Sequence, residues 1–227
     1  MKMFLSVVVA LAVLGGVLYF VAPYLKTAEP AIVEEERTEE AGVEVKTERI
    51  QESDAAYAID VSYPQFGIAS IDAQIKEIVS NAVTEFKSLP ANPAGSATPQ
   101  NSFDGSFDSV YIGPDVVSVK LILSQYTGGA HPLTLVSGLN YDRATGRQLL
   151  QSDAFAMLGL SVDEISAAAT TELKTKLGDA MFEEGANTNP ENFSSFVISE
   201  NEITFIFQQY QTAAYAAGVQ EVRFPRK

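Results

Sequence analysis

The sequence of 227 residues contains no cysteine and a single histidine, His131. The absence of cysteine excludes disulfide bonds, thiolate metal sites, a cysteine nucleophile and the lipidated cysteine of a lipoprotein. One histidine cannot form a histidine-rich zinc site, because a catalytic zinc normally has three protein ligands. The metal centre that remains possible is one in which two carboxylates and His131 are the ligands.

Basic side chains are also scarce, with 15 lysines and arginines against 29 acidic residues. The net charge of −14 disfavours nucleic acid or anionic lipid as a broad-surface partner and suits a basic one. The hydrophobic share of 46% is ordinary for a globular chain, and the length allows one sizeable domain with accessory segments.

The first 26 residues carry no charge between Lys2 and Lys26. Residues 4–22 are uncharged and mostly apolar, close to the roughly 20 residues that a helix needs to cross a bilayer. We expect a transmembrane signal-anchor over residues 1–25, with membrane contact through residues 4–24, a cytoplasmic N-terminus and an extracytoplasmic C-terminal domain. A cleavable signal peptide is the alternative, although it would have a shorter apolar core and a small-x-small cleavage site.

Residues 26–42 are polar and acidic and include a run of three glutamates. Such a segment cannot bury enough apolar surface to fold alone, so it is predicted to be a flexible linker. Beyond it we expect an N-terminal companion module of strand and helix over residues 43–110. A second module follows over residues 111–227, and together the two modules form one compact unit.

Alternating apolar and polar residues predict the strands of this unit, and repeats at three and four residues predict its helices. A helix capped by Ser70 is expected over residues 71–89, and a second one opens with the capping box Ser161–Glu164 and ends at Gly178. The expected strands are 58–63, 107–112, 116–126, 134–141, 147–150, 219–224 and a hairpin over 197–208. The prediction is an α+β fold, with a largely antiparallel sheet carrying two main helices, preceded by the transmembrane helix.

The segment 127–132, with the sequence TGGAHP, lies between two predicted strands. Gly128, Gly129 and Pro132 are typical of a tight turn, and Gly146 belongs to the next turn. His131 could hydrogen-bond the backbone of this turn, contact a ligand, or act in catalysis or metal binding. A metal site would need two carboxylates beside His131, and Asp142 and Asp153 are the candidates. A general base would need an orienting carboxylate and a nearby nucleophile such as Thr127 or Ser137.

Amphipathic aromatic rings suit sugar or protein surfaces, and several tyrosines could line a cleft beside this turn. Packing in the core with a hydrogen-bonded hydroxyl is the alternative for each of them. The candidate ligand-binding residues are Tyr126, His131, Asn140, Asp142, Tyr210 and Tyr215. No catalytic residue, metal ligand or cofactor is predicted.

Several motifs together resemble a family of bacterial extracytoplasmic domains. They are Tyr126–Pro132, Asn140–Asp142 with Thr145-Gly146, Asp153 and Phe155, Asn192-Phe193, Phe205–Phe207, Tyr210 and Ala214–Gly218. Tyr63-Pro64-Gln65 and the following helix are similar to the companion module of that family, so the resemblance covers residues 57–227. Such a pair forms the outer part of a lysozyme-sensing anti-sigma factor and the non-catalytic part of a peptidoglycan deacetylase.

The resemblance implies a membrane-anchored, non-enzymatic module that binds or senses a ligand in the cell envelope. A basic protein such as lysozyme and cell-wall glycan are the expected partners, and nucleic acid is not expected. The predicted cytoplasmic part of three residues is too short for a sigma-binding segment, and no separate catalytic domain with metal ligands is recognised. The alternative is an envelope hydrolase that acts on peptidoglycan with His131 as general base.

Overall fold

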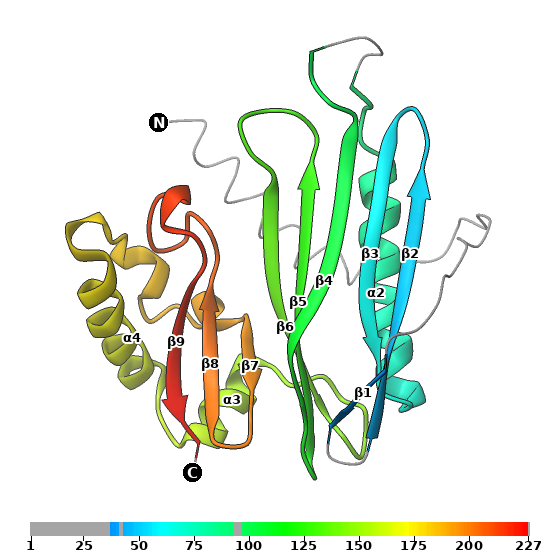
Figure 1. Ribbon diagram of the computed structural model, residues 1–227. Helices are drawn as coiled ribbons and strands as arrows, with labels where there is room; N and C mark the ends of the chain where they lie inside the picture. Colours follow the sequence, from blue (N-terminus) through cyan, green and yellow to red (C-terminus); the bar gives the residue numbers. More distant parts are fainter. Residues whose placement is uncertain (1–36, 41–42, 93–96, 227) are drawn as a thin grey trace. The chain divides into compact units, whose positions relative to one another are not determined.

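A computed structural model describes residues 37–40, 43–92 and 97–226 (Figure 1). The expected transmembrane segment 1–25 and most of the expected linker 26–42 lie outside these ranges. Within them, no helix is both long and apolar enough to cross a membrane. The described residues belong to one compact unit, residues 31–227.

Among the described residues, the larger sheet has six strands in the order of the sequence. They are β1 (Arg37–Glu40), β2 (Val43–Ser53), β3 (Tyr57–Gln65), β4 (Asn101–Ile112), β5 (Val116–Tyr126) and β6 (Leu133–Asp142). All neighbours are antiparallel except β3 and β4, which run parallel because α2 (Ala69–Lys87) crosses over between them. The prediction of a largely antiparallel sheet is therefore confirmed, but it missed this parallel pair. The predicted module boundary at residue 110 falls inside β4.

The helix α2 covers one face of the larger sheet. Its buried side chains recur at helical spacing and pack with the inward-facing residues of the strands. They are Ile71, Ile75, Val79, Val83 and Phe86. The predicted cap at Ser70 is wrong, because the helix begins one residue earlier. In the described structure no side chain caps the start of α2, and the Asp72 carboxylate accepts a hydrogen bond of 2.7 Å from the N–H of Phe66, which precedes the helix.

A second, three-stranded antiparallel sheet was not expected as a separate sheet. It contains β7 (Phe196–Ile198), β8 (Glu202–Phe207) and β9 (Gln220–Pro225). Two helices precede it, α3 (Gln151–Leu158) and α4 (Val162–Leu177), and four 3₁₀ turns follow the helices or connect the strands. These turns are η1 (Gly178–Ala180), η2 (Glu183–Ala186), η3 (Pro190–Phe193) and η4 (Tyr215–Ala217). The described part thus has three helices and two sheets, where two main helices on one sheet were predicted.

The local signals of this second half predict its elements only in part. The capping box opens α4, with the Ser161 hydroxyl accepting from the Glu164 N–H, and Gly178 ends the helix at φ +57°. The strand predicted over residues 147–150 is wrong. Only Gln148 bridges to Tyr141, and α3 starts directly afterwards, where Asp153 accepts from the Leu150 N–H.

The smaller sheet has its own aromatic core with α3 and α4. Phe193 and Phe205 meet edge to face at 5.4 Å between ring centroids, and Phe205 and Phe224 do so at 5.6 Å. A small apolar cluster of Val136, Val197 and Ile206 joins the two sheets. Because Val136 alternates with the β6 residues that face α2, the smaller sheet packs on the opposite face of the larger one.

Candidate functional site

The TGGAHP turn connects β5 to β6 at one end of the larger sheet. Gly128 and Gly129 have φ values of +107° and +105°, a region that other residues rarely adopt. The Tyr126 hydroxyl donates to the carbonyl oxygen of Gly129 at 3.2 Å. This backbone conformation turns the following residues, including His131, out to solvent.

His131 lies against two tyrosines that come from the far end of the chain. Its ring stacks on the ring of Tyr215, with 3.6 Å between centroids and 16° between planes. The ring centroid of Tyr210 is 6.4 Å from that of His131 and 5.6 Å from that of Tyr215. We call His131, Tyr210 and Tyr215 the aromatic cluster.

Hydrogen bonds fix the orientation of the imidazole. Its Nδ1 is 3.0 Å from the carbonyl oxygen of Pro132, which can only accept, so Nδ1 carries a proton. In the neutral ring Nε2 is then an acceptor, and it lies 3.3 Å from the Tyr210 hydroxyl. The Tyr215 hydroxyl donates to the same Pro132 carbonyl at 3.3 Å.

The loop between β8 and β9 presents both tyrosines. Gln211 holds it, because its side chain accepts from the Gln208 N–H and donates to the carbonyls of Gly185 and Asn192. Tyr210 has a φ of +67°, in the left-handed region that costs a bulky residue about 1–2 kcal/mol. It is nevertheless 50% exposed, so burial of its ring does not offset this cost. Backbone strain of this kind is often found at binding sites.

The carboxylates proposed as partners of His131 lie elsewhere. Asp142 is at the opposite end of β6, about 30 Å along the strand. Hydrogen bonds from Thr145 lower the pKa of Asp142. A hydrogen-bonded ion pair with Arg147 lowers the pKa of Asp153. Among the described residues, no group of three histidines and carboxylates could hold a metal ion.

Asn140 is fully buried between the two sheets and is not part of the aromatic cluster. Its Nδ2 donates to the Phe196 carbonyl at 2.7 Å, and its Oδ1 accepts from the Ser118 hydroxyl at 2.7 Å. The Ser118 hydroxyl in turn accepts from the Ile198 N–H at 2.9 Å. We call Ser118, Asn140 and these two backbone groups the inter-sheet polar contact. The structure thus brings Tyr126, His131, Tyr210 and Tyr215 to one end of the sheet and separates Asn140 and Asp142 from them.

Side chains of the second half also cover the outer edge of β6. Gln208 donates to the Val136 carbonyl at 2.6 Å and accepts from the Val136 N–H at 3.0 Å. The Ser195 hydroxyl donates to the same carbonyl and accepts from the Gly138 N–H. Sequence reasoning missed these residues, because the sequence carries no signal that a glutamine would pair with a strand 72 positions away.

Two family models match the chain over separate ranges. Residues 50–134 match the family described as deacetylase PdaC, and residues 158–227 match the family described as protein of unknown function DUF3298. The TGGAHP turn lies in the first range, and Tyr210 and Tyr215 lie in the second. His131 and the two tyrosines of the aromatic cluster therefore lie in segments that match different families.

Curated relatives are distant. Peptidoglycan-N-acetylmuramic acid deacetylase PdaC of Bacillus subtilis is 26% identical over 226 residues, which are 97% of this chain and 48% of that protein. The chain thus spans about half the length of that relative. Immunogenic protein MPT64 of Mycobacterium tuberculosis is 22% identical over 185 residues, 78% of each chain.

A solved structure supports the same fold. The crystal structure of a DUF3298 family member from Bacteroides fragilis has a TM-score of 0.54 at 19% identity, covering 81% of this chain and 90% of that chain. The resemblance to the peptidoglycan deacetylase is confirmed as distant homology, whereas the resemblance to an anti-sigma factor stays a prediction. The chain joins a PdaC-type segment to a DUF3298-type segment, with distant homology to PdaC and MPT64.

Proposed function

We propose that this chain is a non-enzymatic binding module of the cell envelope that holds peptidoglycan glycan on its aromatic cluster. The observation that carries the proposal is the stacked pair of His131 and Tyr215 beside the hydroxyl of Tyr210, on an exposed turn. A structural core would bury such rings, whereas here His131 and Tyr210 both face solvent.

The chemistry of the cluster suits an amino sugar. The faces of aromatic rings carry partial negative charge, which attracts the polarised C–H bonds on one side of a pyranose ring. The two tyrosine hydroxyls lie at the border of the rings and offer hydrogen bonds to sugar hydroxyl or acetamido groups. The distant homology to a deacetylase named for peptidoglycan N-acetylmuramic acid supports the choice of this glycan.

An anchor in the membrane would keep this module at the cell wall. We propose that residues 4–24 supply it, with the domain outside the membrane, because residues 4–22 are uncharged and apolar over nearly a bilayer thickness. A reporter enzyme that is active only outside the cytoplasm, fused to the C-terminus, tests this topology. An inactive fusion that fractionates with the cytosol would contradict it.

We propose binding without catalysis because of the partners of His131. A general base must reach a proton at about 2.6–3.2 Å and is usually oriented by another group. The tyrosine hydroxyl at Nε2 lies at 3.3 Å, beyond this reach, and the carboxylates of Asp142 and Asp153, which could orient and charge-stabilise the ring, lie elsewhere. Turnover of muropeptides that disappears in His131→Ala, with unchanged folding, would instead establish the hydrolase alternative.

The decisive binding experiment compares Tyr215→Ala with Tyr111→Ala. Both remove a partly exposed tyrosine, and Tyr111 lies near the far end of β4, opposite the turn. We expect the full chain to bind soluble peptidoglycan fragments in calorimetry, and Tyr215→Ala to weaken binding about tenfold, as loss of about 1.4 kcal/mol would. Tyr111→Ala should bind as the wild type does. Equal affinity of all three proteins would contradict the proposed site.

A basic envelope protein such as lysozyme is the second candidate ligand, and the charge of the domain favours it. Residues 55–227 hold nineteen acidic and ten basic side chains, a net charge of −9. Association driven by this charge would be fast at low salt and would fall steeply as salt increases. Glycan binding through ring stacking and hydrogen bonds should change little with salt, so a salt series with lysozyme and with glycan fragments separates the two ligands.

A further inference from the structure

Among the described residues, the strand β9 forms an edge of the smaller sheet. The one described strand that pairs with it is β8, where Glu221 faces Ile206 and Arg223 faces Thr204. Lys176 donates to the main-chain oxygen of Glu221 at 2.7 Å, so this carbonyl points away from β8. Outward groups recur at every second residue of an antiparallel strand, and the main chain of Arg223 therefore also faces outward.

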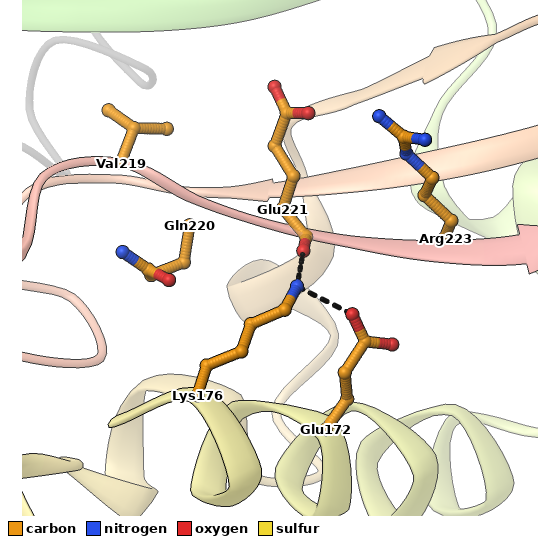
Figure 2. Close-up of a pocket in the computed structure, with 6 residues that line it drawn as sticks. All are labelled: Glu172, Lys176, Val219, Gln220, Glu221 and Arg223. Atoms are coloured by element: carbon orange, nitrogen blue, oxygen red, sulfur yellow. Dashed lines mark hydrogen bonds and ion pairs between the residues drawn. The ribbon is translucent and has the colours of Figure 1, made fainter. Parts of the chain in front are cut away.

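A groove runs along this edge, between β9 and α4 (Figure 2). It has a volume of about 470 Å³. Glu172 and Lys176 reach it from α4, and their side chains form an ion pair of 2.5 Å. The side chains of Glu221 and Arg223 project together from β9 on the side away from α4 (Figure 2).

The charges beside this edge are incompletely balanced. Lys120 of β5 contacts two carboxylates, Glu221 at 2.9 Å and Asp108 at 3.2 Å. Arg223 is exposed and forms no ion pair with any residue that the structure describes. Glu221 on this edge thus shares the cation of Lys120 with Asp108. Arg223, two residues further, has no acidic partner among the described residues.

We propose that β9 pairs in antiparallel fashion with β9 of a second copy of this chain, around a twofold axis at Val222. In this register Glu221 lies opposite Arg223 of the second copy, and Arg223 lies opposite its Glu221. Both residues have outward main-chain groups, so each of these pairs exchanges two N–H···O hydrogen bonds. The two smaller sheets become one continuous sheet.

A second copy fits this edge better than an unrelated peptide because the charge pattern is self-complementary. A twofold interface places the same patch on both sides, and here each carboxylate meets an arginine. Glu221 and Asp108 then have two cations between them. One is Lys120 of the same copy, and the other is Arg223 of the second copy. Lys176 must release the Glu221 carbonyl, and it keeps Glu172 as its partner.

A pair of charge reversals tests the register. Glu221→Arg places arginines opposite arginines, and Arg223→Glu places glutamates opposite glutamates, so each variant alone should be monomeric. Mixed in equal amounts, they restore every Glu–Arg pair and should form a heterodimer. Sedimentation velocity of the full chain in detergent should give a dimer for the wild type and for the mixture, with thermal unfolding as the check on folding.

A lysine on a sheet edge also commonly protects the edge against pairing with another strand. The variant Lys176→Ala distinguishes an edge that pairs with a second copy from an edge that Lys176 keeps unpaired. If β9 pairs with itself, the wild type dimerises and Lys176→Ala dimerises at least as strongly. A wild type that stays monomeric while Lys176→Ala dimerises would show that Lys176 blocks this edge and would overturn the proposal. A dimer that both charge reversals leave intact would overturn it too, because the contact would lie elsewhere.

Discussion

The inter-sheet polar contact and the aromatic cluster are built from the same two parts of the chain. Both join the β5–β6 hairpin to the segment after α4, and they lie at different places along β6. Asn140 and Ser118 are fully buried, and their side chains bond to the strand β7 at 2.7–2.9 Å. His131 and Tyr210 are exposed and meet at 3.3 Å.

This difference distinguishes polar groups that stabilise the fold from polar groups that can bind a ligand. A buried donor or acceptor that loses its partner costs about 1–3 kcal/mol, so the inter-sheet polar contact specifies how the sheets meet. An exposed hydroxyl exchanges its partner with water at little cost, so the cluster can release its contacts to a ligand. The two regions should therefore respond to mutation in opposite ways.

The largest effect should follow from Gly138→Ala. A Cβ at this position would lie 1.6 Å from the Phe196 carbonyl oxygen, and neither backbone can move without separating the sheets. We expect a loss of at least about 3 kcal/mol in denaturant unfolding. The neighbouring variant Ser137→Ala, as control, should lose less than about 1 kcal/mol. A stable Gly138→Ala protein would show that the sheets do not meet as described.

Asn140→Ala should cost about 2–3 kcal/mol in unfolding free energy, because it leaves the buried Phe196 carbonyl without its donor. Ser118→Ala removes the partner of both Asn140 and Ile198. Because the groups share one network, the double variant should lose less than the sum of the single losses. Additive losses would indicate independent bonds.

Tyr141→Phe tests a tyrosine that the core holds without a hydrogen bond. Among the described residues its buried hydroxyl has no partner, and burial raises the pKa of the phenol above its ordinary value. Removing the hydroxyl should stabilise the protein by about 1 kcal/mol at neutral pH.

The same shift predicts a dependence on alkaline pH. Because burial disfavours the phenolate, the unfolded chain ionises at a lower pH than the folded protein, so the wild type loses stability as pH rises above the unfolded pKa of about 10. Tyr141→Phe should therefore lose less stability than the wild type above about pH 10. The unfolding free energy measured at neutral and alkaline pH checks this, and equal slopes would contradict the assignment to Tyr141.

Tyr215→Ala should cost only about 1 kcal/mol in stability, the scale of one aromatic pair, although it removes the ring stacked on His131. The binding of glycan fragments should fall about tenfold in the same variant. If unfolding instead shows a loss comparable to that of Asn140→Ala, the cluster is a structural contact.

The smallest effect is expected for Tyr210→Gly. Glycine relieves the φ of +67°, and this gain offsets the packing that an exposed ring provides, so stability should stay within about 0.5 kcal/mol. Glycan binding should nevertheless weaken. A variant that binds normally would show that the strained tyrosine has no role at the site.

Local patterns explain how much of the fold could be predicted. The spacing of Ile71, Ile75 and Val79 gives α2, and Ser161 with Glu164 gives the start of α4. The TGGAHP turn and the hairpin of β7 and β8 also follow from short signals. The parallel pairing of β3 with β4 and the division into two sheets do not, because both depend on long-range contacts.

The candidate site shows the same limit. Tyr126, His131, Tyr210 and Tyr215 could be selected as aromatic groups near a turn or a strand end. From the sequence alone, Asn140 is an equally good candidate for ligand binding, because a polar residue in an alternating strand can face solvent or a second sheet. Only the packing of Phe196 over β6 decides that it is buried.

The most direct test uses the single histidine as a reporter. In an NMR titration of the full chain in detergent with soluble peptidoglycan fragments, the ring signals of His131 are unambiguous because no other imidazole is present. We expect these signals to shift in a saturable way and Tyr215→Ala to reduce the shift strongly. Fragment binding that leaves the His131 signals unchanged would contradict glycan recognition by the aromatic cluster.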